Sequence, residues 1–181
     1  MLRFLAVFVG LLALMFGFEL TPWAQHWLVA PWTDAVARAA TTVIHVFDPA
    51  VRAHGNVVGA GDGSFAVSIE AGCNGVEATL VLIAAMIAWP ASWLRRASGI
   101  VIGTLAVQGL NIVRVISLFY LGQWNRDAFE WAHLYVWQAL IMLDVLVVWL
   151  LWVRWSPEHG DRSPGPPAGP SGSPSAPAPA A

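Results

Sequence analysis

The sequence predicts an all-α integral membrane protein with about four transmembrane helices, an extracytoplasmic amphipathic helix and a short β-hairpin. Three observations support this fold class. Of the 181 residues, 57% are hydrophobic and only 11% are charged; long apolar segments recur along the chain; and 11 residues are tryptophan. A typical soluble domain carries about 25% charged residues, and tryptophan is enriched at bilayer interfaces. The formal net charge of -2 gives no indication of nucleic-acid binding.

The first apolar segment covers residues 4–18, between Arg3 and Glu19. Its length also fits the core of a signal peptide, but no A-x-A-like cleavage site follows it. We therefore predict an uncleaved first span that extends to about Leu20.

Three more apolar segments have the length of membrane spans, namely residues 76–94, 97–121 and 134–153. After the last of them the composition changes to Pro, Gly, Ser and Ala, which cannot form a core. Residues 1–155 are therefore predicted to form one membrane domain, and residues 156–181 a disordered cytoplasmic tail.

The segment between the first two spans is too polar to cross a membrane. Its first half shows a helical pattern that predicts an amphipathic helix lying on the membrane. The apolar face of this helix consists of Val36, Ala40, Val43, Ile44 and Phe47.

The second half of the same segment predicts a β-hairpin that leads the chain to Cys73. Val57 and Val58 enter the hairpin, residues 59–63 are a glycine-rich turn, and an alternating apolar pattern follows. The alternating residues are Phe65, Val67 and Ile69.

The arginines predict the orientation of the spans. Arg3, the Arg95-Arg96 pair and Arg154 lie on the same side of a four-span topology, which the positive-inside rule makes cytoplasmic. Both termini are then cytoplasmic, and the hairpin and the loop of residues 122–133 face outward. Three other arginines, at positions 38, 52 and 126, fall on the outer side and weaken the count.

This topology places three reactive side chains in one layer near the outer surface. Cys73 lies at the outer end of the second span and His133 at the outer start of the fourth. Arg114 lies seven residues from the outer end of the third span, roughly 10 Å below the surface, where an arginine can still snorkel to the interface.

A thiol, an imidazole and a guanidinium together suit acyl transfer. The thiolate of Cys73 is a nucleophile, and His133 can move protons near neutral pH. Arg114 can stabilise an oxyanion or hold a carboxylate. Because the chain has a single cysteine, an internal disulfide, a CxxC pair and a multi-thiolate metal site are excluded. No metal and no cofactor is predicted.

Four other polar residues are predicted to support this site. Asn74 can cap the helix that begins the second span, and Glu77 completes a capping-box-like N-x-x-E; a thiol at such a helix end is favoured as thiolate. Asn111 lies one turn from Arg114. Asp144 has a depth close to that of Asn111, so a hydrogen bond between them is expected.

Each of these residues also has a non-catalytic interpretation. A lone cysteine is usually a small buried residue, and an arginine within a span is often structural. Glu77 is more often a cap and Asp144 more often a structural group. A non-catalytic membrane subunit or small transporter, with Arg114 and Asp144 as structural polar contacts, therefore remains an alternative. The meeting of three reactive side chains in one layer favours catalysis.

At these residues the sequence resembles the exosortase/archaeosortase family of integral membrane proteins. The resemblance rests on "EAGCNGVEA", "NIVR" and "FEWAHLYVWQ", in this order. The "CNGVEA" form and the compact length look most like the exosortase H subgroup. The resemblance covers roughly residues 3–155, although the chain is shorter than typical exosortases.

The resemblance implies a sortase-like cysteine protease or transpeptidase in the bacterial inner membrane. By this resemblance Cys73 is the nucleophile, His133 the general acid and base, and Arg114 the stabilising cation. The implied partners are exported proteins with a C-terminal sorting signal, which consists of an Ile-Pro-Thr-Leu-type motif, a transmembrane helix and an arginine cluster. Membrane lipid is the other implied partner, and nucleic acid is not.

Overall fold

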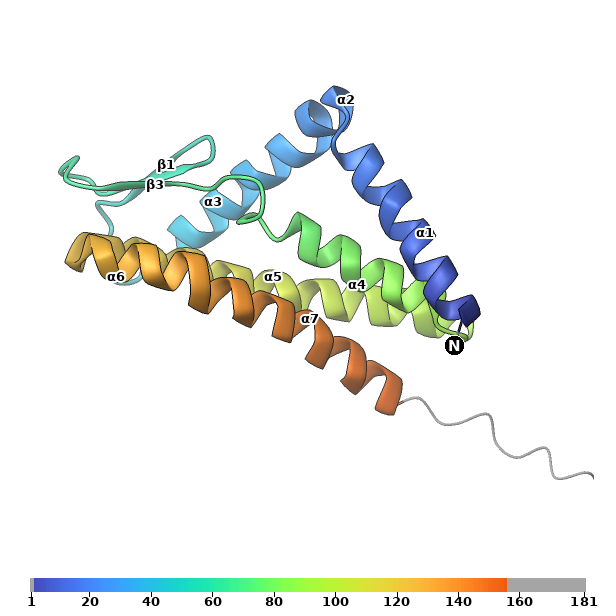
Figure 1. The fold of residues 1–181 in the computed structure, drawn as a ribbon. Coiled ribbons are helices and arrows are strands. Elements are labelled where there is room, and N and C mark those ends of the chain that lie inside the picture. The colour runs from blue at the N-terminus through green and yellow to red at the C-terminus, as the bar shows by residue number, and fades with distance from the viewer. Residues whose placement is uncertain (1, 156–181) are drawn as a thin grey trace, which may run out of the picture.

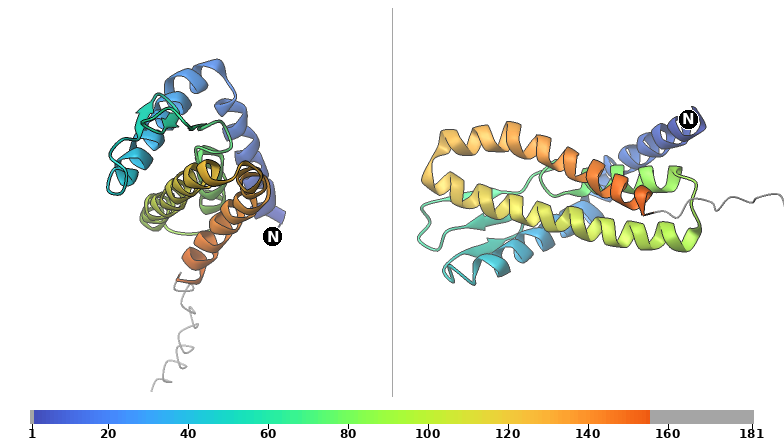
Figure 2. Two further views of the ribbon diagram at one scale, coloured as in Figure 1. Left: turned by 90° about the vertical axis from the view of Figure 1, so that its left-hand side faces the viewer. Right: turned by 90° about the horizontal axis from the view of Figure 1, so that it is seen from below.

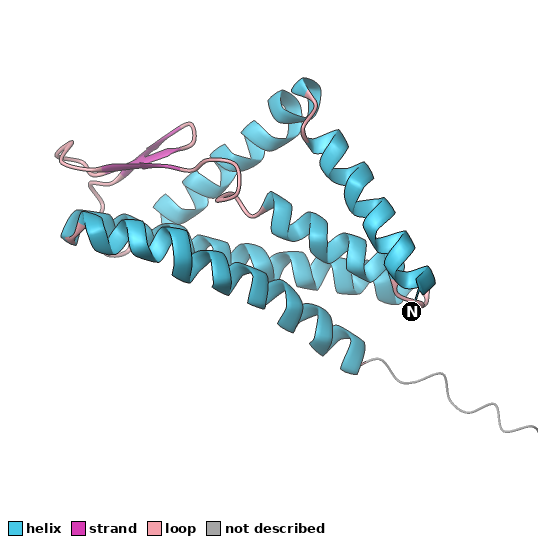
Figure 3. Ribbon diagram, in the orientation of Figure 1, coloured by secondary structure: helices cyan, strands magenta, loops and turns pink. Residues whose placement is uncertain are grey.

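The computed structural model describes residues 2–155, and the predicted tail of residues 156–181 lies outside this part of the chain. The described chain is mostly helical (Figure 3). Its elements are α1 (Leu2–Glu19), α2 (Pro22–Ala24), a π-helical turn η1 (Gln25–Val29), α3 (Ala30–Ile44), β1 (Arg52–His54), β2 (Val57–Gly59), β3 (Ala66–Ser68), α4 (Val76–Ala88), α5 (Trp93–Trp124), α6 (Arg126–Trp131), a second π-helical turn η2 (Ala132–Val136) and α7 (Trp137–Arg154).

Three helical stretches within residues 2–155 are long and apolar enough to cross a membrane: Leu2–Glu19, Trp93–Trp124 and Arg126–Arg154. The last combines α6, η2 and α7 into one continuous rod. They correspond to the predicted first, third and fourth spans. The chain is thus a multi-pass membrane protein by length and composition, and the predicted second span corresponds to the shorter helix α4.

The helix α4 has only 13 residues, so the predicted span of residues 76–94 was too long. The chain leaves the helix at Trp89, whose backbone is extended, and Pro90 follows. The residue before a proline is disfavoured in the α region, which explains the end of the helix at this point. Trp93 and Leu94, counted in the second span, belong to α5.

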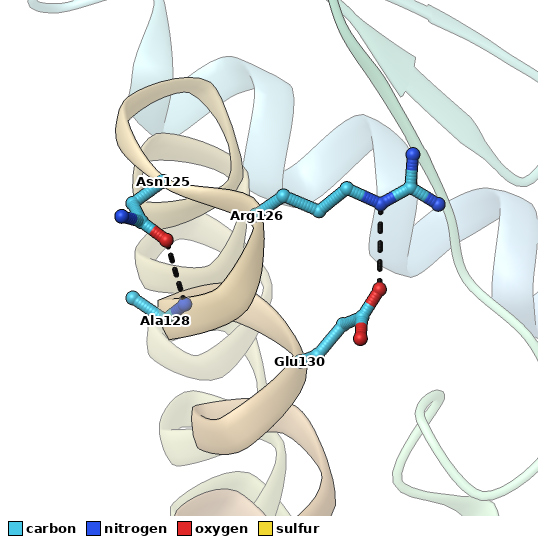
Figure 4. Close-up of polar contacts among 4 residues, drawn as sticks. All are labelled: Asn125, Arg126, Ala128 and Glu130. Carbon is cyan, nitrogen blue, oxygen red and sulfur yellow. Dashed lines mark hydrogen bonds and ion pairs between the residues drawn. The ribbon is translucent and has the colours of Figure 1, made fainter.

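The prediction of an outer loop at residues 122–133 is also wrong, because most of this segment is helical. The helix α5 continues to Trp124, and α6 begins at Arg126. Asn125 alone separates them, and its Oδ1 accepts a hydrogen bond from the Ala128 N–H at 2.9 Å (Figure 4). This is a favourable N-cap. Arg126 and Glu130 form an exposed ion pair on the same turn (Figure 4).

The predicted hairpin is confirmed, and a strand that was not predicted extends it. β2 and β3 pair antiparallel with Val58 opposite Val67. β1 pairs with the other edge of β2 and completes a three-stranded sheet in the order β1-β2-β3. The sheet lies beside α3 and the C-terminal half of α5 (Figure 1).

The predicted amphipathic helix is confirmed as α3, but its apolar face packs against protein. Val36, Ala40 and Ile44 are buried together with Val58 of the sheet and Phe119 of α5. The other two residues assigned to this face, at positions 43 and 47, are 45% and 80% exposed. Val43 lies at the edge of the buried face, whereas Phe47 lies beyond the end of the helix at Ile44, so the sequence pattern predicted a helix that was too long.

A second core holds α4, α5 and α7 together. It contains Leu82 and Met86 of α4, Val107 of α5, and Ile141 and Val145 of α7. The helix α4 therefore lies between the longer helices, with α1 above it and α7 below it in the view of Figure 1; two further views are shown in Figure 2. This arrangement brings the segment just before α4 into the centre of the molecule.

Candidate active site

Cys73 lies in a tight turn that joins β3 to α4. Its N–H donates to the Glu70 carbonyl at 2.9 Å. The glycines on either side of the Cys73-Asn74 pair, Gly72 and Gly75, have φ angles of 82° and 75°. Residues other than glycine rarely adopt this left-handed backbone conformation. The two glycines therefore allow the chain to fold back on itself and present the thiol.

The side chain of Asn74 fixes this turn to α3 and α4. Asn74 is 1% exposed; its Nδ2 donates to Thr33 Oγ1 at 3.0 Å, and its Oδ1 accepts from the Val76 N–H at 3.0 Å. The Trp32 indole N–H of α3 donates to the Asn74 carbonyl at 3.3 Å. The residue next to the thiol is therefore held from three directions.

The expected capping box is replaced by a different arrangement. The N-cap position of α4 is Gly75, so Asn74 caps from one residue further out, through the first helical N–H. The Glu77 Oε1 accepts from the Gly72 N–H at 2.6 Å and not from the N–H of Asn74. Glu77 thus ties the first turn of α4 to the residue before Cys73.

The three reactive side chains predicted for one layer are in direct contact. The Cys73 Sγ lies 3.1 Å from Nε2 of His133, within hydrogen-bond reach for a sulfur atom. The Arg114 Nη2 donates to the same sulfur at 3.4 Å, and Nη1 donates to the Gly72 carbonyl at 3.3 Å. An imidazole, which accepts a proton in one of its two tautomers, and a fixed cation therefore both face the thiol, which is the geometry that nucleophilic catalysis needs.

His133 is positioned by an irregular turn of its helix. It lies in η2, where the Trp137 N–H bonds the Ala132 carbonyl five residues earlier. Such single π-turns are frequent at functional sites. The Phe129 ring lies 5.6 Å from the imidazole, centroid to centroid, and the rings are tilted by 31°. The ring of Phe129 therefore supports the face of the imidazole.

Arg114 is 2% exposed, although it carries a full charge. Its Nε has no hydrogen-bond partner within residues 2–155. Arg114 also forms no salt bridge with these residues, among which Arg126 and Glu130 form the ion pair. A buried charge without a counter-ion is unfavourable by several kcal/mol. The Gly72 carbonyl and the thiol of Cys73 are the groups that face it instead.

The protonation of the thiol is set by opposing effects. Burial raises the pKa of Cys73 above the usual range of a thiol, the Arg114 charge acts in the opposite direction, and the carboxylates of Glu77 and Glu70 add to the increase. The expectation that the helix end favours the thiolate is therefore not met in the resting site. A neutral thiol needs a base when it reacts, and His133 lies within reach of its proton.

Asn111 and Asp144 do not form the hydrogen bond that was expected. Asn111 is fully buried, and neither its Oδ1 nor its Nδ2 has a partner among the described residues. The Asp144 Oδ2 is likewise without a partner there. Similar depth in two helices does not fix the rotation of either helix, so a common depth was not sufficient evidence for contact.

Several residues of the site were not predicted. Gln108 Nε2 donates to the Gly75 carbonyl and to Thr79 Oγ1, both at 3.0 Å. Its position in an apolar span was the one signal for it. No signal in the sequence marked Trp32 or Thr33, because contacts between α3 and the Cys73 turn join positions about 40 residues apart.

No curated protein and no solved structure matches the chain significantly. The family model described as Transmembrane exosortase (Exosortase_EpsH) matches residues 1–151, which is nearly all of the described chain and includes the Cys73 turn, Arg114 and His133. The chain therefore belongs to the transmembrane exosortase family.

Proposed function

We propose that this protein is a membrane cysteine protease or transpeptidase that cleaves the C-terminal sorting signal of exported proteins. The observation that carries the proposal is the contact of the Cys73 sulfur with both His133 and Arg114, at 3.1 and 3.4 Å. Membership of the transmembrane exosortase family supports the same reaction class.

In the proposed reaction, His133 Nε2 takes the thiol proton as the Cys73 sulfur attacks the carbonyl carbon of the scissile peptide bond. The carbonyl oxygen becomes an oxyanion, which the Arg114 guanidinium stabilises. The C–N bond then breaks, and the imidazolium returns its proton to the leaving amine. The product is a thioester on Cys73, which water or an amine resolves. His133 again accepts the proton of that second nucleophile.

We further propose that the site faces outward from the bacterial inner membrane. Arg114 lies 21 residues after Trp93, the first residue of α5. At 1.5 Å per residue this separation is about 32 Å, close to the ~30 Å thickness of the hydrocarbon core. The Arg95-Arg96 pair at the start of α5 is cytoplasmic by the positive-inside rule. In this topology α4 makes the second crossing, and the Cys73 turn lies at its outer end.

The proposed substrate ends in an Ile-Pro-Thr-Leu-type motif, a transmembrane helix and an arginine cluster. The test is to express the protein together with a tagged secreted reporter that carries such an end. We expect processing by the wild-type chain and none by Cys73→Ala or Cys73→Ser. Processing that continues at the wild-type rate in both variants would refute the proposal.

The alternative of a non-catalytic subunit makes the opposite prediction. It requires Arg114 and Asp144 to act as structural polar contacts. Arg114 instead contacts the reactive turn, and the Asp144 Oδ2 has no partner within residues 2–155. If Cys73→Ala is silent while Arg114→Ala prevents assembly in the membrane, the subunit interpretation is correct.

A further inference from the structure

An apolar groove of about 830 Å³ runs along α4 between α1 and α7. Its floor is the small-residue side of α4, with Ala78 and Ala85. Phe8 of α1 lies on one wall and Met142 of α7 on the other. In the view of Figure 1, α1 and α7 lie on opposite sides of α4. The groove is therefore bounded by two helices that are themselves long and apolar enough to cross the membrane.

One end of this groove is the turn that carries the reactive thiol. Gly72, Gly75 and Glu77 line it there. Gly72 is the residue whose carbonyl accepts from Arg114 and whose N–H donates to Glu77. A chain lying in the groove would thus meet the Cys73 turn at the end of the groove.

The dimensions of the groove fit one side of a helix. Its lining extends from Glu77 to Ala85 along α4 and from Gln138 to Trp149 along α7. At 1.5 Å per residue these stretches are about 12 and 16 Å long, or two to three helical turns. The groove therefore covers about half of a ~30 Å hydrocarbon core.

The polarity of the lining changes along its length. After Gln138 in the sequence, the α7 residues that line the groove are all apolar. Glu77, Gln138 and the backbone of Gly72 are at the end near the thiol. A peptide in lipid must be helical, because no water satisfies its backbone groups. Where it unwinds to expose a peptide bond it needs polar partners, and this groove provides them at that end alone.

We propose that this groove receives the transmembrane helix of the substrate and delivers the residues before that helix to Cys73. The proposal rests on the proposed function for the identity of the occupant. The small residues Ala78 and Ala85 in the lining support it, because helices approach closely in membranes where small side chains face each other.

The test uses disulfide trapping, for which this chain is well suited. Cys73 is its only cysteine, so Cys73→Ala gives a cysteine-free and uncleaving background. Into it we would place Phe8→Cys or Met142→Cys, one on each wall. The matched control is Leu140→Cys. Leu140 is also on α7, is 39% exposed against 59% for Met142, and lies about 200° around the helix from it.

The probe is a tagged secreted reporter that ends in Ile-Pro-Thr-Leu, a helix of about 20 leucine and alanine residues, and an arginine cluster. It carries one cysteine, moved along the helix. At each wall we expect disulfides with probe positions that recur every three or four residues, since these share one face of a helix. Phe8 and Met142 should select opposite faces of the probe helix, and Leu140 should trap none. Processing of the same probe by the wild-type chain is measured separately.

The two readouts separate the two proposals. Equal trapping at Leu140 and Met142, or no trapping at either wall while Cys73-dependent processing proceeds, would overturn the groove proposal and leave the proposed function in place. A groove that holds only lipid gives the second of these results. Trapping at both walls without processing would overturn the proposed function and leave the groove as a helix-docking site. Neither trapping nor processing would overturn both.

Discussion

Asn74 is expected to be a major determinant of both stability and thiol position, and the Asn74→Ala variant tests this directly. The side chain is 1% exposed and makes two hydrogen bonds, as donor to Thr33 Oγ1 and as acceptor from the Val76 N–H, both at 3.0 Å. Alanine removes both. It leaves the first N–H of α4 without its partner and releases the Cys73 turn from α3.

The size of the effect follows from these contacts. A typical hydrogen bond contributes about 1 kcal/mol, and a buried donor left without a partner costs about 1–3 kcal/mol. The lost bond to Thr33 and the orphaned Val76 N–H therefore predict a loss of about 2–4 kcal/mol in the free energy of unfolding. We expect Cys73 to react faster with a small neutral alkylating reagent in the same variant, because its turn is less restrained.

The assay is equilibrium unfolding in mild detergent, followed by circular dichroism. The control is Thr33→Val, which removes one partner of Asn74 at nearly constant volume. The two changes act on the same bond, so their combination should cost less than the sum of the single losses. A loss below about 0.5 kcal/mol in Asn74→Ala, the range of ordinary surface substitutions, or strict additivity with Thr33→Val, would refute this reasoning.

Two further predictions concern the charges at the thiol and the packing of the helices. In the wild-type chain the Arg114 charge lowers the pKa of the buried thiol, so in Arg114→Gln the midpoint of the pH dependence of thiol alkylation should move to higher pH. The Glu77 carboxylate raises that pKa, so in Glu77→Gln the midpoint should move to lower pH. Shifts in the reverse directions would contradict this account. Gly99→Ala should lower the free energy of unfolding by about 1–3 kcal/mol, because its Cβ would overlap an indole ring of α7. Gly10→Ala, whose Cβ meets nothing within 4 Å, is its control in the same unfolding measurement and should have no such cost.

The placement of the three reactive side chains in one layer was within reach of sequence reasoning, whereas their contact was not. Hydropathy located the long spans, and counting crossings placed Cys73, Arg114 and His133 in one layer. That argument needed only the number and direction of the crossings. It therefore survived the shortening of the second span, since α4 still begins beside the Cys73 turn.

Other features depended on information that a single sequence does not contain. Apolar composition did not show that α5 continues to Trp124, because the same residues are compatible with a loop near the membrane surface. β1 has three residues and becomes a strand through its pairing with β2. A helical repeat gives the relative angles of side chains on one helix, but not which neighbour covers them. This is why Val43 was assigned to the buried face of α3 and is 45% exposed.

The surroundings of Arg114 bear on why the Cys73 turn is held so firmly. A carboxylate beside a buried guanidinium would be the usual way to stabilise it, and it would also neutralise the charge. Among the described residues no carboxylate fills this place, and the guanidinium instead donates to a backbone carbonyl and to the thiol. These weaker partners keep the cation available to a developing oxyanion, and they stabilise it only if the turn stays in place. The bonds of Asn74 to α3 and of Glu77 to Gly72 provide that restraint. In this interpretation, a change that loosens the turn should weaken the hydrogen bonds that stabilise Arg114 as well as displace the thiol.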